Sequence, residues 1–483
     1  MTHPLPTRPR LADHVLARRH ITGGETVVVL HDQRTGRIIQ LGPREWGLLA
    51  AADGTRDLEG VILAARREGA HARVPALHSF LEQLHSAGLL ADGAPDDSAP
   101  DLPTATLDDA APPASDPLPL ALAEDRPLDV LPDFSLHCDG SGSCCRIYAS
   151  VIFGPVEAAR ARALFPAIQG GGDRHERVFL PDRGSAPTGG SAVTLVDGRC
   201  AYLGESGHCS IHERAGGPAK PIGCNLFPAS FLDDGERIAV SASVECACIL
   251  ASVGRPGGAP LIPPEAQRRG DLDPSVHIAR LPARLAVTRA ASADRSAVRL
   301  WSRRLATFPP FADTAQTLWS LAASVEAQGF DADPLPCFHS PPPIDPLAIL
   351  PWIGALANRA ARRVREDAVW RSERDLARLA TSWIADAAVA LLSSGSVSLP
   401  PSAPEGEAFY LRAALHGYKL FGDLPLSVAL RDRAVRLLVA RALPDVFARV
   451  GATDPACAHP LALVEAMLRG HGLDAYVHDL DVG

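Results

Sequence analysis

Eight of the ten cysteines in this 483-residue chain lie between residues 138 and 248. Thiols gathered in one stretch of a chain without secretory features indicate metal ligands, because a reducing compartment does not sustain structural disulfides. A metal centre constrains the fold, since its ligands meet only when the chain wraps around the metal. The stretch therefore predicts a metal-binding domain with eight candidate ligands: Cys138, Cys144, Cys145, Cys200, Cys209, Cys224, Cys246 and Cys248.

Four disulfides in an exported protein are the alternative reading of the same cysteines. The first residues, MTHPLPTRPRLADHVLARRH, contain no apolar run of signal-peptide length. Disulfide scaffolds are also typical of short chains with a poor core, whereas this long chain is 46% hydrophobic. No segment approaches the roughly 20 apolar residues of a membrane span, and the net charge of −9 does not favour nucleic-acid binding. We therefore expect a cytoplasmic protein without a membrane or nucleic-acid partner.

The composition changes along the chain predict a multidomain α+β protein with four parts. Residues 1–91 form a small domain, and residues 92–131 form a linker rich in Pro, Asp and Ala that buries too little apolar surface to be ordered. Residues 132–260 form the cysteine-rich metal-binding domain of short strands, helices and loops. Residues 261–483 are mostly α-helical, with apolar residues at helical spacing over 294–306, 355–388, 409–420 and 428–443.

The first domain reads as two strands followed by three helices. The runs 26–30 and 37–41 flank a turn-rich segment and predict a β-hairpin. Helices are expected from about Pro43, after Thr55 as the N-cap, and over residues 74–90. This order suits a small winged-helix-like fold.

The residues of this domain carry a family resemblance. The stretch VVVLHDQRTGRIIQLGPREWGLLAAADGTRDLEGVI, followed by FLEQLHSAGLL, resembles PqqD-type domains, the RiPP recognition elements. The resemblance implies capture of a peptide that adds as a strand to the sheet edge beside a helix. A DNA-binding winged helix and a purely structural module are the alternatives. The 11 Arg against 9 Asp and Glu in residues 1–91 give little positive charge for binding phosphates.

The cysteines fall into four elements with different spacings. Adjacent cysteines tend to point their side chains apart, so Cys144 and Cys145 suit a polynuclear centre, or one metal ligand and one packing thiol, better than a single zinc ion. Gly204 and Gly207 predict a hairpin that holds Cys200 and Cys209 near each other. Thiolate ligands suit zinc or an iron–sulfur cluster, and four of them suffice for one [4Fe–4S] cluster.

In order and spacing, these elements resemble the YkgJ-type zinc- or iron-chelating proteins with their CxxCxxCC signature. The segments CNLFP (224–228) and SVECACIL (243–250) are especially similar to the flagellin lysine-N-methylase branch. The resemblance implies a metal centre, favours an iron–sulfur cluster, and implies S-adenosylmethionine-dependent methylation of lysine. Ser141 stands where the signature has its second cysteine, so this chain departs from the family's ligand set.

Other residues are weaker candidates for the same site. His212, three residues after Cys209, reads mainly as a loop histidine that forms hydrogen bonds. Cys248 is a less secure ligand than Cys246, because cysteines one residue apart seldom bind one metal together. Two Cys-x-His pairs, Cys337–His339 and Cys457–His459, lie far downstream and are more typical of a helical core than of a second metal site.

Two hypotheses of function follow. In the first, the protein recognises a peptide or protein substrate through residues 1–91 and modifies it with the help of the metal domain. In the second, the metal centre is non-catalytic and serves as a structural element or as a redox or metal sensor. The sequence identifies no catalytic base, no methyl-donor site and no oligomeric state.

Overall fold

The computed structural model describes residues 5–480 except 33, 36, 68–73, 94–124, 149–150, 166–190, 275, 307–312, 332–334, 369, 394–403, 423, 471–475 and 478–479. It contains both helices and sheets, so the predicted α+β class is confirmed. The chain forms two compact units. Unit 1 comprises Met1–Leu107, Cys145–Pro221 and Glu366–Arg378, and unit 2 comprises Asp108–Cys144, Ile222–Arg365 and Leu379–Gly483.

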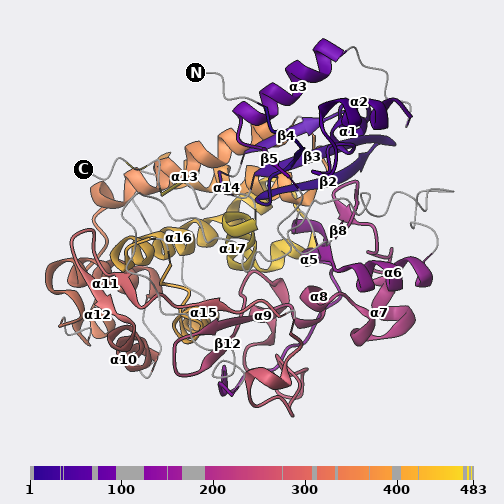
Figure 1. Cartoon of the computed structure of the whole chain (residues 1–483). Coiled ribbons are helices and arrows are strands. Elements are labelled where there is room, and N and C mark those ends of the chain that lie inside the picture. Colours follow the sequence, from indigo (N-terminus) through magenta and orange to yellow (C-terminus); the bar gives the residue numbers. More distant parts are fainter. Residues whose placement is uncertain are drawn as a thin grey trace. The chain divides into compact units, whose positions relative to one another are not determined.

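Unit 1 is built on a five-stranded sheet with the order β10-β9-β2-β3-β4. Strands β2 (Val15–Thr22), β3 (Glu25–Asp32) and β4 (Ile38–Leu41) form an antiparallel meander (Figure 1). The turn between β2 and β3 contains Gly23 and Gly24, both with positive φ, a conformation that glycine adopts without steric cost. Strand β9 (Leu195–Val196) pairs in parallel with β2, and β10 (Arg199–Cys200) pairs with β9.

Three helices and a small ribbon complete the N-terminal part of unit 1. The helices are α1 (Pro43–Leu49), α2 (Leu58–Arg67) and α3 (Val74–Ser86), and β1 (Pro9–Leu11) pairs with β5 (Leu90–Asp92). The predicted hairpin and three helices are therefore confirmed, but β1, β2 and β5 were not predicted. The predicted N-cap Thr55 is wrong, because Asp57 directly precedes α2 and its side chain accepts the Gly60 N–H at 2.8 Å.

The remainder of unit 1 surrounds a second small core. It contains α5 (Ser143–Ile147) at the border of the unit, β7 (Ile152–Phe153), β8 (Ser191–Ala192), α6 (Pro155–Leu164), α7 (Ser210–Ala215) and the 3-10 turn η2 (Gly217–Ala219). Phe153, Tyr202 and Ile211 are buried there, with Cys200 and Cys209 packed at its margin. Apolar burial thus fixes the segment that carries these two cysteines.

Unit 2 begins with a four-stranded sheet of order β13-β11-β12-β6. Strands β11 (Ala229–Asp233) and β12 (Ile238–Ala242) form a hairpin, with β6 (Leu128–Val130) parallel to β12 and β13 (Ala279–Arg280) parallel to β11. Short helices α8 (Ile222–Leu226) and α9 (Ala247–Ser252) flank this hairpin in sequence. After the turn η3 (Arg269–Asp271), β14 (Arg284–Ala286) pairs with β15 (Ser292–Asp294).

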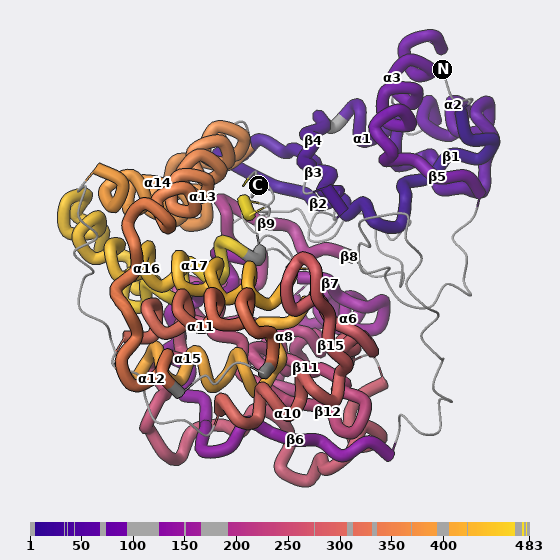
Figure 2. The backbone as a smooth tube through the Cα atoms, turned by 90° about the vertical axis from the view of Figure 1, so that its left-hand side faces the viewer, coloured from indigo at the N-terminus to yellow at the C-terminus, as the bar shows by residue number. Residues whose placement is uncertain are grey.

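The predicted helical C-terminal region is present. Helix α16 (Leu426–Val450) is almost entirely buried and lies against α11 (Thr314–Gln328) and α17 (Pro460–Gly470) (Figure 2). The predicted segment 355–388 contains parts of two helices, α13 and α14. The other elements of this region are α10 (Arg295–Ala306), α12 (Leu335–His339), α13 (Pro346–Asp367), α14 (Leu376–Ser393), α15 (Pro404–His416), η4 (Gly329–Asp331) and η5 (Pro455–Ala458).

The predicted domain boundaries do not coincide with the two units, since the cysteine-rich segment 132–260 is divided between them. Most of the predicted linker 92–131 lies outside the described residues, but its end contributes β6 to the sheet of unit 2. Helix α14 has the length and mean hydropathy of a membrane span, 1.3 over 18 residues, with 56% of that window buried. The sequence analysis found no segment with the character of a membrane span, and the buried core helix of a globular protein can show the same length and hydropathy.

Candidate metal centre

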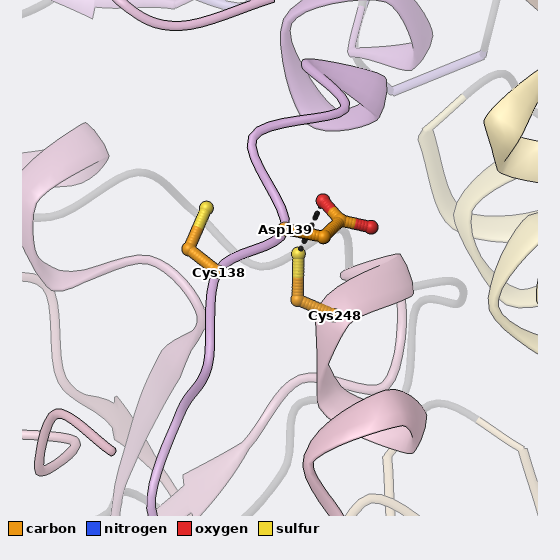
Figure 3. Close-up of side chains that lie close together, drawn as sticks. All are labelled: Cys138, Asp139 and Cys248. Carbon is orange, nitrogen blue, oxygen red and sulfur yellow. Dashed lines mark hydrogen bonds between the residues drawn. The ribbon is translucent and has the colours of Figure 1, made fainter.

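Two thiols and a carboxylate converge in unit 2. The Sγ atoms of Cys138 and Cys248 and a carboxylate oxygen of Asp139 all lie within 4.8 Å of one another (Figure 3). Cys138 and Asp139 are exposed, whereas Cys248 is only 6% exposed in the first turn of α9. In the described part of the chain, this is the one group of three or more His, Cys, Asp or Glu side chains that meets this distance.

Backbone pairing fixes the segment that carries Cys138 beside α9. Leu136 exchanges two hydrogen bonds with Ala259, at 2.7 and 2.9 Å. The N–H of His137 donates to Ser252 Oγ at 2.9 Å, and this hydroxyl donates to the Cys248 carbonyl at 2.7 Å. The last residue of α9 thus ties the Cys138 segment to the residue that supplies the second thiol.

Asp139 is held by its own loop. Its Oδ1 accepts the Ser141 N–H at 2.8 Å and the Cys248 thiol at 3.2 Å. The Ser141 hydroxyl is hydrogen-bonded to Ser143 at 2.8 Å. Ser141 therefore orients the carboxylate of Asp139, which the sequence analysis did not identify as a candidate.

The environment keeps both thiols protonated when no metal is bound. A hydrogen bond with Cys248, together with burial, raises the pKa of Cys138 far above its ordinary value. The bond with Cys138 lowers the pKa of Cys248, but a hydrogen bond with Cys246 and burial outweigh it and raise this pKa to about 12. A metal that binds here has to displace these protons. Cys246, the N-cap residue of α9, is 7% exposed and contacts the site through Cys248.

The pKa values of Asp139 and of His459 are both lowered, for different reasons. Burial acts to raise the pKa of Asp139, but hydrogen bonds from Ser141 and Cys248 and the charge of His459 hold it below its usual value. Burial lowers the pKa of His459, against the opposing effect of Asp139. Asp139 is therefore ionised at neutral pH and is available as an oxygen donor.

The eight predicted ligands do not form one group. Cys145, Cys200 and Cys209 belong to unit 1, whereas Cys138, Cys144, Cys224, Cys246 and Cys248 belong to unit 2. The predicted turn between Cys200 and Cys209 is present, because the Gly204 N–H donates to the His208 carbonyl at 2.9 Å and Leu203 pairs with Cys209. Tyr202 lies between them in sequence, and burial, reinforced by both cysteines, raises its pKa.

The weaker candidates are also placed. His212 is exposed on α7, and Cys337 is buried in α12 with His339 exposed. Cys457 lies in η5, two residues before His459. No disulfide joins the ten cysteines, all of which lie within the described residues.

The donor atoms suit one metal ion. Two thiolates bound to tetrahedral zinc through bonds of about 2.3 Å stand about 3.8 Å apart, and the observed donor atoms lie within 4.8 Å of one another. In a [4Fe–4S] cluster, by contrast, each thiolate binds a different iron.

No family model, no curated protein and no solved structure matches this chain.

Proposed function

We propose that this protein binds a metal ion through Cys138, Asp139 and Cys248, recognises a peptide or protein segment through unit 1, and modifies it. The observation that carries the proposal is the convergence of these three donors from segments more than a hundred residues apart. Hydrogen bonds that fix both segments support a built site, because they place the donors before a metal arrives. Cys246 supports the site by contacting the thiol of Cys248.

The donor set favours a single zinc ion. Two sulfurs and one oxygen match the ligands that zinc accepts, and the close approach of the two thiols suits one ion. The iron–sulfur cluster implied by the YkgJ resemblance would need further thiolates, for which Cys144 and Cys224 are candidates within the same unit. Metal analysis separates these two forms of the centre.

Peptide recognition is proposed for the β4 edge of unit 1, whose strands and helices suit the winged-helix-like, PqqD-type domain. The other side of the meander is covered, because β9 pairs with β2. Strand β4 ends the sheet. The Asp32 N–H donates to the Arg37 carbonyl at 2.9 Å, so these two residues form a hydrogen-bonded pair. Hydrogen-bonded and non-hydrogen-bonded pairs alternate along an antiparallel ladder. Ile38 and Gln40 therefore direct their backbone groups away from β3. Those groups are available to an added strand.

The proposed reaction is methylation of lysine with S-adenosylmethionine as the methyl donor, as the resemblance to flagellin lysine-N-methylase implies. Exposure of Cys138 and Asp139 leaves the metal site reachable from solvent, which a modifying centre requires. No side chains are assigned to the methyl donor. Transfer of a labelled methyl group from S-adenosylmethionine to lysine in captured peptides, detected by mass spectrometry, tests this step.

A non-catalytic metal site is the second candidate function. The adjacent thiols of Cys138 and Cys248, of which one is exposed, favour a redox- or metal-sensing role over a purely structural one. In that case metal binding and peptide binding would both be present, but methyl transfer would be absent.

The first experiment measures zinc, iron and sulfide per chain after anaerobic purification. We expect one zinc ion that is lost in Cys138→Ser and Cys248→Ser and kept in the control Cys337→Ser, which changes a buried thiol in α12. A content of about four irons and four sulfides per chain would instead show that the centre is an iron–sulfur cluster. A protein that binds neither metal, alone or after reconstitution, would overturn the proposal.

A further inference from the structure

Two thiols that are distant in the sequence approach each other in unit 2. The Sγ atoms of Cys138 and Cys248 lie within 4.8 Å of each other, and neither residue is in a disulfide. Figure 3 shows them on two neighbouring segments, the loop that carries Cys138 and the first turn of α9. A sulfur–sulfur bond measures about 2.05 Å, so the two atoms have to close by at most about 2.8 Å to form one.

The loop that carries Cys138 can make this approach while α9 stays in place. Cys138 lies in a stretch without helix or strand, between the Leu136–Ala259 pair and α5. Its side chain is exposed and free to change its rotamer, whereas the side chain of Cys248 is 6% exposed in α9. The bond from the His137 N–H to Ser252 Oγ keeps the loop beside α9. Cys138 is therefore the thiol that moves, and Cys248 is the fixed partner.

We propose that Cys138 and Cys248 form a reversible disulfide in the metal-free protein, and that this bond closes the metal site. The inference concerns regulation of the site proposed above, and its effect on metal binding rests on that site. Metals bind thiolates, so the disulfide removes two of the three donors. A bound metal conversely engages both sulfurs and protects them from oxidation.

The oxidant is a low-molecular-weight disulfide such as oxidised glutathione. The sulfur of the exposed Cys138 attacks it and forms a mixed disulfide, which releases one glutathione thiol. The Cys248 sulfur then attacks the Cys138 sulfur and releases the second glutathione thiol. The two protein sulfurs give two electrons to the oxidant, and their two protons end on the released thiols. The raised pKa of each protein thiol, which reflects the hydrogen bonds and burial described above, slows this exchange at neutral pH. The test therefore measures an equilibrium.

Metal-free, full-length protein is equilibrated anaerobically in glutathione buffers of increasing oxidised fraction, quenched with acid, alkylated and mapped by mass spectrometry. We expect a disulfide between Cys138 and Cys248 that is absent in Cys138→Ser. It should be kept in the control Cys337→Ser and in Cys246→Ser, which removes the thiol two residues before Cys248. Excess Zn²⁺ should lower the oxidised fraction at least about tenfold in the same buffer. The oxidised protein should bind no Zn²⁺ in chelator competition until it is reduced.

The outcomes separate this inference from the proposed function. The disulfide is refuted if both thiols are still alkylated in oxidised glutathione alone, if Cys138 keeps a mixed disulfide, or if Cys246 is the partner of Cys248. The zinc content of the reduced protein then decides on the metal site by itself. If the disulfide forms but the reduced protein binds no zinc, the metal site falls, and with it the regulation of metal binding. The mapping of the unchanged protein does not depend on the folding of any variant.

Discussion

The thiol of Cys248 donates a hydrogen bond to the carboxylate of Asp139 at 3.2 Å, across 109 residues of sequence. The acceptor is a group that could also bind a metal, and the donated proton is the one that a metal would replace. The bond therefore places an oxygen donor and a sulfur donor in position before the metal arrives.

Replacing Asp139 by Asn tests whether its charge contributes to metal binding. The amide keeps the size and the oxygen acceptor but removes the negative charge, so we expect Zn²⁺ affinity to fall about 10- to 100-fold. Asp294→Asn, at an exposed position of the same unit, is the control and should leave the affinity unchanged. Equal affinities of Asp139→Asn and the unchanged protein in chelator competition would remove Asp139 from the ligand set.

A second prediction concerns a buried charge network in the helical part of unit 2. Glu465 on α17 accepts hydrogen bonds from Tyr410 at 2.8 Å and Arg436 at 3.1 Å, and it also pairs with Arg433. Glu465→Gln leaves two buried guanidinium groups without full compensation, so we expect a loss of about 3–5 kcal/mol in the free energy of unfolding. Glu326→Gln breaks a more exposed pair with Arg431 and should cost about 0–1 kcal/mol.

The same network predicts a pH dependence of stability. Burial acts to raise the pKa of Glu465, but Arg433 and Arg436 outweigh it and lower this pKa from 4.5 to about 2. A carboxylate with a depressed pKa stabilises the folded state fully above its unfolded pKa and loses this contribution as the pH falls through the folded value. The contribution is about 3 kcal/mol at neutral pH. The difference in free energy of unfolding between the unchanged protein and Glu465→Gln, measured by urea unfolding, should therefore become smaller below about pH 4.5. A difference that grows below this pH would contradict the lowered pKa of Glu465.

The sequence predicted those parts of unit 1 whose pattern is local. Hairpin β3–β4 has β-branched runs around a turn, and helices α1 to α3 show regular apolar spacing. Strand β2 was missed because its centre contains Arg18, Arg19 and His20, which read as surface residues. In the structure Arg18 and His20 are buried, and the His20 ring packs edge-on against Trp370 with a centroid distance of 4.8 Å. A segment some 350 residues away makes this strand a buried one, which no local pattern could indicate.

The candidate site was predictable only in part for a similar reason. Cysteine spacing located the segments but did not indicate which thiols meet. That pairing depends on the contact of the Cys138 segment with Ser252 and Ala259, which is non-local. Asp139 was missed because an Asp-Gly pair after a cysteine reads as a turn. Its role depends on Cys248, which the sequence analysis had ranked below Cys246.

A fourth prediction uses two glycines with nearly the same positive φ in unit 1. Gly54 and Gly93 have φ of +80° and +78°, so alanine at either position should cost about 1–2 kcal/mol in conformational strain. At Gly54 an added Cβ would also lie 2.1 Å from the Gly93 carbonyl oxygen, whereas at Gly93 it would meet nothing within 4 Å. Gly54→Ala should therefore lower stability by at least about 1 kcal/mol more than Gly93→Ala. Equal denaturation midpoints of the two variants would contradict the close approach of the Gly93 carbonyl oxygen to Gly54.

The last prediction tests peptide capture at the β4 edge with one residue changed in two ways. Gln40 is exposed, and its N–H points away from β3, so Gln40→Pro removes a donor that an added strand would use without breaking the β3–β4 ladder. Gln40→Ala keeps that N–H. For peptides selected from a random display library with the unchanged protein, we expect Gln40→Pro to weaken binding at least about tenfold and Gln40→Ala to have little effect, as measured by fluorescence polarisation. A loss of binding in both variants would assign recognition to the glutamine side chain, and retention in both would place the peptide away from this edge. Equal melting temperatures of the two variants would show that the proline leaves the domain folded, so that the difference in affinity reports on strand addition alone.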